Sequence, residues 1–113
     1  MPPSIDQNTL TELLDNLGAA SLSRIIEVFL DELDAQIDEI RSHLATREFA
    51  LIANLAHTIK STTATFGATD LTVIAEMIET AAKTEEFDAL ASLVKTLHES
   101  TQAIKPHYSM YTE

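Results

Sequence analysis

Apolar residues recur every three or four positions in five segments of the chain, which is the spacing of one face of an α-helix. No segment shows the strict alternation of apolar and polar residues that marks a half-buried strand. The chain of 113 residues contains only two glycines and three prolines, which makes a β-sandwich or a glycine-rich nucleotide site improbable. Together these features predict an all-α protein.

The five expected helices cover about residues 6–17, 21–46, 47–66, 70–82 and 86–104. Gly18 and Gly67 follow the first and third helices at the usual C-terminal position, and Asp70 can cap the fourth. Pro106 is expected to block continuation of the fifth. Because short connections force neighbours to run antiparallel, we expect an up-down-up-down four-helix bundle with a short extra N-terminal helix. A chain of this length predicts one domain over residues 1–113.

The chain is strongly acidic, with 18 Asp and Glu against 7 Lys and Arg and a net charge of −11. Phosphate-rich partners need clustered cations, so this balance argues against binding nucleic acid or an anionic membrane. The absence of cysteine excludes disulfides, thiolate zinc sites and cysteine nucleophiles. Neither a signal peptide pattern nor an apolar run of about 20 residues is visible, so the expected location is the cytoplasm.

The third helical segment differs from the rest of the chain because Lys60 is its only charged side chain between Glu48 and Asp70. At about 100° per residue, a core-facing stripe through Ile52 and Ile59 leaves His57 pointing outward. Small residues stack above and below His57 on that flank, namely Ala50, Ala53, Ser61 and Ala64. The pattern predicts an exposed imidazole on a low, uncharged surface, with one cation a turn away.

Phosphoryl transfer explains this combination of residues. Neutral imidazole is a good nucleophile near neutral pH, and Lys60 could offset the negative charge of a phosphoryl group bound to His57. Small neighbours would let the active site of a partner approach for in-line transfer. From position alone, however, an exposed histidine on a helix is also an ordinary solvated residue, and that alternative stays open.

Residues 57–68 read HTIKSTTATFGA and resemble the signature of histidine-containing phosphotransfer (HPt) domains. That signature has a histidine, an apolar residue two positions later, a lysine at the third position, a small residue, and a glycine ten positions after the histidine. His57, Ile59, Lys60, Ser61 and Gly67 fill these places, although Ser61 stands where the family most often has glycine. The resemblance extends over the chain, because the family folds as an acidic four-helix bundle with a short leading helix.

The resemblance implies that His57 is phosphorylated and that Lys60 helps to hold the phosphoryl group. It further implies that Glu79, on the next helix, accepts a hydrogen bond from Nδ1 of the histidine and leaves Nε2 as the nucleophile. The implied partner-docking surface surrounds His57 and comprises Ala50, Ala53, Asn54, Ser61 and Ala64, with Leu51 and Leu55 at its far edge. An exposed, solvated carboxylate remains the alternative for Glu79.

The function implied by the resemblance is that of a phosphorelay intermediate. Such a protein accepts a phosphoryl group from a phospho-Asp receiver domain or a sensor histidine kinase and passes it to a response regulator. It is a covalent carrier without autonomous catalysis and without its own cofactor, since Mg²⁺ is expected on the receiver. A monomer is the simpler expectation for a carrier that must shuttle.

A related version of this function is the phosphoacceptor module of a chemotaxis-type kinase, in which a kinase domain phosphorylates His57 directly. From a different class, the chain could be a helical adaptor that binds partners and never carries phosphate. An acyl carrier protein is nearly excluded, because such proteins need an Asp-Ser-Leu attachment site where this chain has Asp70-Leu71-Thr72.

The other histidines have simpler interpretations. His43 is expected to satisfy carbonyls at the end of the second helix, His98 to lie half-buried beside an apolar stripe, and His107 to lie in a tail after Pro106. No two histidines have the three- or four-residue spacing of a helix-based metal site, so no metal site is expected.

Overall fold

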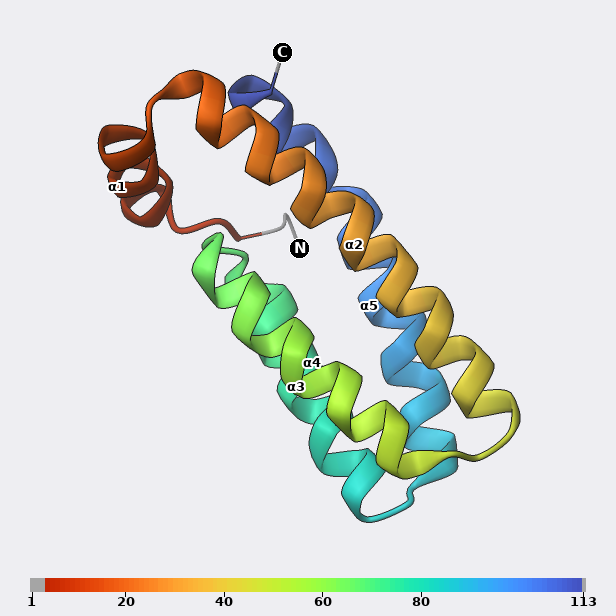
Figure 1. Cartoon of the computed structure of the whole chain (residues 1–113). Coiled ribbons are helices and arrows are strands. Elements are labelled where there is room, and N and C mark those ends of the chain that lie inside the picture. The colour runs from red at the N-terminus through yellow and green to blue at the C-terminus, as the bar shows by residue number, and fades with distance from the viewer. Residues whose placement is uncertain (1–3, 113) are drawn as a thin grey trace.

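The computed structural model describes residues 4–112, and all the regular secondary structure in this part of the chain is helical. Its helices are α1 (Gln7–Leu17), α2 (Ala19–Ala45), α3 (Phe49–Thr65), α4 (Thr69–Lys83) and α5 (Phe87–Tyr108), followed by the short 3₁₀-helix η1 (Ser109–Tyr111). Helices α2 to α5 form an antiparallel bundle, and α1 lies across the end that holds the α3–α4 turn and the C-terminus (Figure 1). The prediction of a four-helix bundle with a short leading helix is confirmed.

The core is built from the apolar stripes that the sequence predicts. Its fully buried members come from all five helices and include Leu10, Leu22, Ile26, Leu33, Ile37, Ile40, Ile52, Ile59, Leu71, Ile78, Leu90, Leu97 and Ile104. No helix in residues 4–112 has the length and apolar composition needed to cross a membrane. The first helix contributes less than expected, because Leu10 is buried while Leu14 and Leu17 are exposed.

Each turn between the bundle helices contains one residue in the left-handed region, namely Arg47 (φ 55°), Gly67 (φ 72°) and Glu85 (φ 54°). Only the middle turn requires glycine for space as well. A Cβ at position 67 would lie 3.0 Å from the Asp6 carbonyl oxygen and 3.2 Å from Cβ of Thr9. The Asp6 amide also donates to the Gly67 carbonyl at 2.8 Å. Gly67 therefore lets the N-terminal segment dock on the α3–α4 turn.

The prediction that Asp70 caps the fourth helix is wrong. Helix α4 begins at Thr69, with Ala68 at the cap position and no side-chain cap. The Asp70 carboxylate lies within the first turn and accepts a hydrogen bond from the Ser4 amide at 2.9 Å. A contact 66 residues away in sequence therefore uses the side chain that local reasoning assigned to capping.

The prediction that Pro106 blocks helix α5 is also wrong. The helix continues through Pro106 to Tyr108, so His107 lies on a helix and not in a tail. Tyr108 is fully buried, meets the ring of Phe29 edge-on at 5.8 Å, and donates from its hydroxyl to the Phe66 carbonyl at 2.7 Å. We attribute the extra turn to this packing, which offsets the hydrogen bond that proline cannot make.

Candidate functional site

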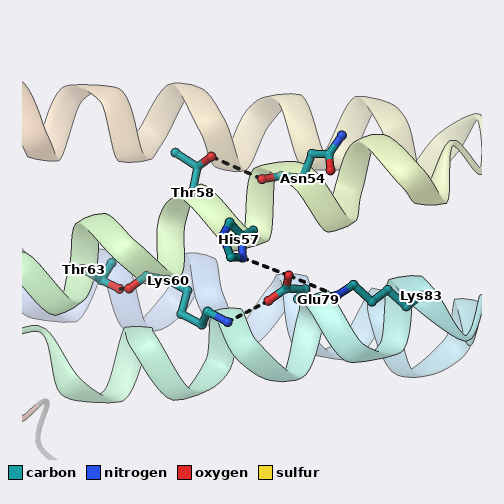
Figure 2. A network of polar contacts seen from close by, with 7 residues as sticks. All are labelled: Asn54, His57, Thr58, Lys60, Thr63, Glu79 and Lys83. Atoms are coloured by element: carbon teal, nitrogen blue, oxygen red, sulfur yellow. Dashed lines mark hydrogen bonds and ion pairs between the residues drawn. The ribbon is translucent and has the colours of Figure 1, made fainter.

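His57 lies near the middle of α3 and points toward α4 along the outer surface of the bundle (Figure 2). The stripe formed by Ile52, Ala56 and Ile59 is buried in the core, and this fixes the direction of the histidine. The side chain of His57 is 66% exposed, so the predicted outward orientation is confirmed.

Glu79 approaches His57 from α4, with its Oε2 atom 3.1 Å from the imidazole Nδ1 atom. The contact expected from the resemblance is therefore present, although the two residues are 22 positions apart. The alternative of an exposed carboxylate is wrong, because Glu79 is the one charged residue that is buried in the described part of the chain. An exposed ring thus rests on a buried acid.

Two lysines complete the cluster around Glu79 (Figure 2). The Lys60 ammonium donates to the Oε1 atom at 2.9 Å, and the Lys83 ammonium lies 3.4 Å from Oε2. Lys60 comes from α3 and Lys83 from α4, so the carboxylate is held from both helices. The interpretation of Lys60 as the only cation near His57 is wrong, because it overlooked Lys83. Its spacing of four residues from Glu79 was the signal that could have revealed it.

The electrostatics of the cluster determine which nitrogen of His57 carries hydrogen. The hydrogen bond from Lys60, reinforced by Lys83, outweighs burial and lowers the pKa of Glu79 to about 2. The same hydrogen bond raises the pKa of Lys60. Glu79 is therefore ionised at neutral pH and can only accept. For the neutral imidazole, Nδ1 must then carry the hydrogen, and Nε2 keeps its lone pair.

The small residues near His57 are divided by their burial. Ala50, Asn54, Ser61 and Ala64 are exposed, as the docking prediction requires. Ala53 is only 8% exposed, so it lies between α3 and α4 and lines the hollow there, and it is not part of the exposed patch. The reason is that α3 packs closely on α4, and this contact turns position 53 inward.

Two hollows lie along α3 and meet at Asn54, one helical turn before His57, which lines neither of them. The first has a volume of about 320 Å³, lies between α3 and α4, and is lined partly by Ala50, Ala53 and Lys83. The second, of about 250 Å³, lies between α2 and α3 and is lined partly by Leu51 and Leu55, with Asn54 common to both hollows. The surface beside the histidine therefore offers apolar depressions on either side of Asn54.

The remaining histidines lie apart from this cluster. His43 does not satisfy the carbonyls at the end of α2 as expected, because the Thr46 hydroxyl takes that position, 3.3 Å from the His43 carbonyl oxygen. The His43 Nδ1 atom lies instead 3.6 Å from Glu48. His98 is half-buried, as predicted. The described residues contain no group of three or more histidine and acidic side chains that could hold a metal ion.

Comparison with known families bears on the role of this site. The family model of the Hpt domain matches residues 24–106, which is most of the chain. This chain belongs to the Hpt domain family. Hpt domains work with histidine kinases and response regulators, and this Hpt domain accordingly acts in histidine phosphotransfer within a phosphorelay.

Individual relatives of this Hpt domain agree with that assignment. The phosphorelay protein LuxU of Vibrio vulnificus (strain YJ016) is 26% identical over 103 residues, which cover 88% of this chain and 90% of LuxU. The Vibrio harveyi LuxU is 26% identical over 82 residues, covering 73% of this chain and 72% of that protein.

A solved structure shows the same fold. Histidine-containing phosphotransfer protein B from Pseudomonas aeruginosa PAO1 superimposes with a TM-score of 0.90, covering 97% of this chain and 95% of that chain. Its sequence identity is only 14%, so this similarity concerns the fold alone.

Proposed function

We propose that His57 is the phosphoacceptor of this Hpt domain and that its Nε2 atom takes the phosphoryl group. The observation that supports the proposal is the exposed imidazole whose Nδ1 atom lies 3.1 Å from the buried carboxylate of Glu79. This contact fixes the tautomer and the ring orientation before a partner arrives, so less reorganisation is needed during transfer.

The proposed step forms one bond and breaks another. The Nε2 lone pair attacks the phosphorus of a receiver phospho-Asp, the N–P bond forms, and the bond from phosphorus to the aspartate oxygen breaks. The receiver regains its carboxylate, while Nδ1 of His57 keeps its hydrogen. The phosphorylated ring then carries a formal positive charge, which the carboxylate of Glu79 stabilises. Transfer to the next receiver is the same step in reverse.

Lys60 and Lys83 have a shared electrostatic role in this proposal. Two ammonium groups beside one carboxylate leave the cluster with a local charge of about +1 when His57 is neutral. In a chain with a net charge of −11, this is a favourable place for a phosphoryl dianion. Lys60 is the more firmly held, with a shorter contact and a 30% exposed side chain against 66% for Lys83.

The proposed docking surface for the receiver is the exposed part of the predicted patch, comprising Ala50, Asn54, Ser61 and Ala64. The hollow of about 320 Å³ beside Ala50 and Lys83 adds depth to this surface, which supports apolar contact with a receiver. Leu51 and Leu55 extend it toward α2. A sensor histidine kinase would reach the same imidazole.

Several further features are part of the proposal. The domain is a phosphocarrier and not an autonomous catalyst, because only an acceptor and its supporting charges are assigned to the chain. It needs no cofactor of its own, since Mg²⁺ is expected on the receiver. We further propose a single domain over residues 1–113 that acts as a monomer in the cytoplasm.

The decisive experiment follows the phosphoryl group. The chain is incubated with phosphorylated receiver domains, and an acid-labile, alkali-stable label on it is measured. We expect label on the wild type and on His107→Gln, which alters an exposed histidine on α5, and none on His57→Gln. Equal label on His57→Gln, or no label on the wild type, would refute the assignment and favour a phosphate-independent adaptor.

A further inference from the structure

A separate apolar groove lies between α4 and α5, with a volume of about 410 Å³. Val73 and Met77 line it from α4, one helical turn apart, and Leu93 lines it from α5. At about 100° per residue, Met77 and Glu79 lie on nearly opposite sides of α4. This α4–α5 groove is therefore distinct from the surface that carries His57.

Two large apolar side chains of the groove, both on α4, are open to solvent, whereas Ala81 is buried and Leu93 is half-buried. Val73 is 56% exposed and Met77 is 50% exposed, whereas the apolar residues of α4 that face the bundle are buried or half-buried. Single exposed apolar residues are common on protein surfaces, but a row of them inside a groove is typical of an interaction site. Val73 and Met77 form an apolar strip along α4 that can pack against the apolar face of a partner helix.

The charges around the groove indicate what kind of partner fits it. Glu76 and Glu86 line its edges, and neither forms an ion pair with any described residue. The Glu86 carboxylate accepts a hydrogen bond from the Thr84 hydroxyl at 2.6 Å, and the charge of Glu76 contributes, after the hydrogen bond to Glu79, to the raised pKa of Lys60. No lysine or arginine is among the described residues that line the groove. A second copy of this chain is a poor fit, because it also carries a net charge of −11 and would bring further negative charge to Glu76 and Glu86. A partner with an apolar face flanked by lysine or arginine would match both the apolar groove and its acidic edges.

We propose that the α4–α5 groove docks an amphipathic helix of a partner protein, with apolar side chains on Val73 and Met77 and with Lys or Arg beside Glu76 and Glu86. Because Val73 and Met77 lie on a different side of α4 from Glu79, a helix seated on them leaves His57 open. The domain can then hold one partner while its histidine exchanges phosphate with another. This proposal does not depend on which histidine accepts the phosphoryl group.

The test uses two synthetic amphipathic helices, one of leucine and lysine and the other of leucine and glutamate. Binding is measured by titration, and the contacted residues are mapped by amide chemical shifts. We expect the basic helix to shift residues of the groove and not the amide of His57, and the acidic helix not to bind. Replacing Val73 and Met77 together by serine keeps the charge and should weaken binding about tenfold.

A matched control separates the groove from general attraction to an acidic protein. Val28→Ser removes an apolar side chain with 50% exposure on α2 and should change binding by no more than about twofold. Replacing Glu76 and Glu86 by glutamine should weaken binding and its salt dependence. Equal binding by both helices, shifts confined to the His57 surface, or binding unaffected by the serine pair would overturn the proposal. Self-association through the groove would also overturn it in favour of a second copy.

Discussion

His57 and His43 both present Nδ1 to a glutamate carboxylate, at 3.1 Å from Glu79 and 3.6 Å from Glu48. The two pairs differ in which partner is buried. The His57 side chain is 66% exposed over a carboxylate that is 11% exposed, whereas His43 is 25% exposed beside a carboxylate that is 48% exposed. A ring that must meet a partner needs the first arrangement, in which the protein fixes the acid and leaves the imidazole outside.

The two carboxylates also differ in what holds them. Glu79 receives two ammonium groups from two helices, while Glu48 accepts mainly from the hydroxyl of Thr46 in the same turn. The His43–Glu48 pair spans five residues and belongs to the turn between α2 and α3. The His57–Glu79 pair spans 22 residues and depends on how α3 packs against α4. The comparison shows that the same contact between histidine and glutamate belongs to a turn in one place and to an exposed candidate site in the other.

The largest effect is expected when each carboxylate is removed in turn. Glu79→Ala should slow phosphoryl transfer to His57 about hundredfold, because the ring loses its fixed tautomer and the charge that stabilises its phosphorylated form. Glu48→Ala should change the rate by no more than about twofold. Rapid-quench measurements with a labelled receiver would give both rates, and similar losses in the two variants would contradict the distinction.

A smaller effect is expected from the lysines that distinguish Glu79. Lys60→Ala should slow transfer about tenfold or shorten the lifetime of the phosphohistidine. Lys83→Ala should slow transfer about threefold. The order follows the contact lengths of 2.9 and 3.4 Å and the greater exposure of Lys83. Lys95→Ala, at an exposed position on α5, is the control. Unchanged kinetics in Lys60→Ala, with folding intact, would remove that residue from the mechanism.

The smallest effect concerns the dependence of stability on pH. The pKa of Glu79 is lowered from its ordinary value of 4.5 to about 2, mainly by the hydrogen bond from Lys60. A lowered pKa stabilises the folded state above the ordinary value, and this stabilisation is lost as the pH falls toward 2. Glu79→Gln should therefore lose less stability than the wild type over this range in urea denaturation.

Glu48→Gln provides the comparison for that experiment. The pKa of Glu48 is also lowered, chiefly by the hydrogen bond from Thr46, but its carboxylate is exposed. The pH profile of this variant should stay closer to that of the wild type. A larger change for Glu48→Gln than for Glu79→Gln would contradict the view that two lysines, against the effect of burial, hold the Glu79 carboxylate in its ionised form more strongly than Thr46 holds Glu48.

Sequence reasoning was strongest for features that repeat within one helix. The stripe through Ile52 and Ile59 gave the direction of His57, and the family motif led from His57 to Glu79 before any contact between α3 and α4 was known. It failed where a residue distant in sequence forms a hydrogen bond with a side chain, or where tertiary packing offsets the loss of a local hydrogen bond. The Asp70 carboxylate accepts a hydrogen bond from the Ser4 amide and does not cap its helix. Helix α5 continues through Pro106, and the turn that follows is stabilised by the packing of Tyr108 and its hydrogen bond to the Phe66 carbonyl.

By itself, the sequence determined the helical class of this protein, its buried stripes and the outward direction of His57, because helical periodicity fixes which side chains share a face. Only the tertiary structure decided that Glu79 of α4 meets both His57 and Lys60 of α3, and that Ala53 is covered. Those features depend on the rotation and register of α4 against α3. Packing of the whole bundle sets that register, and no repeat within a single helix encodes it.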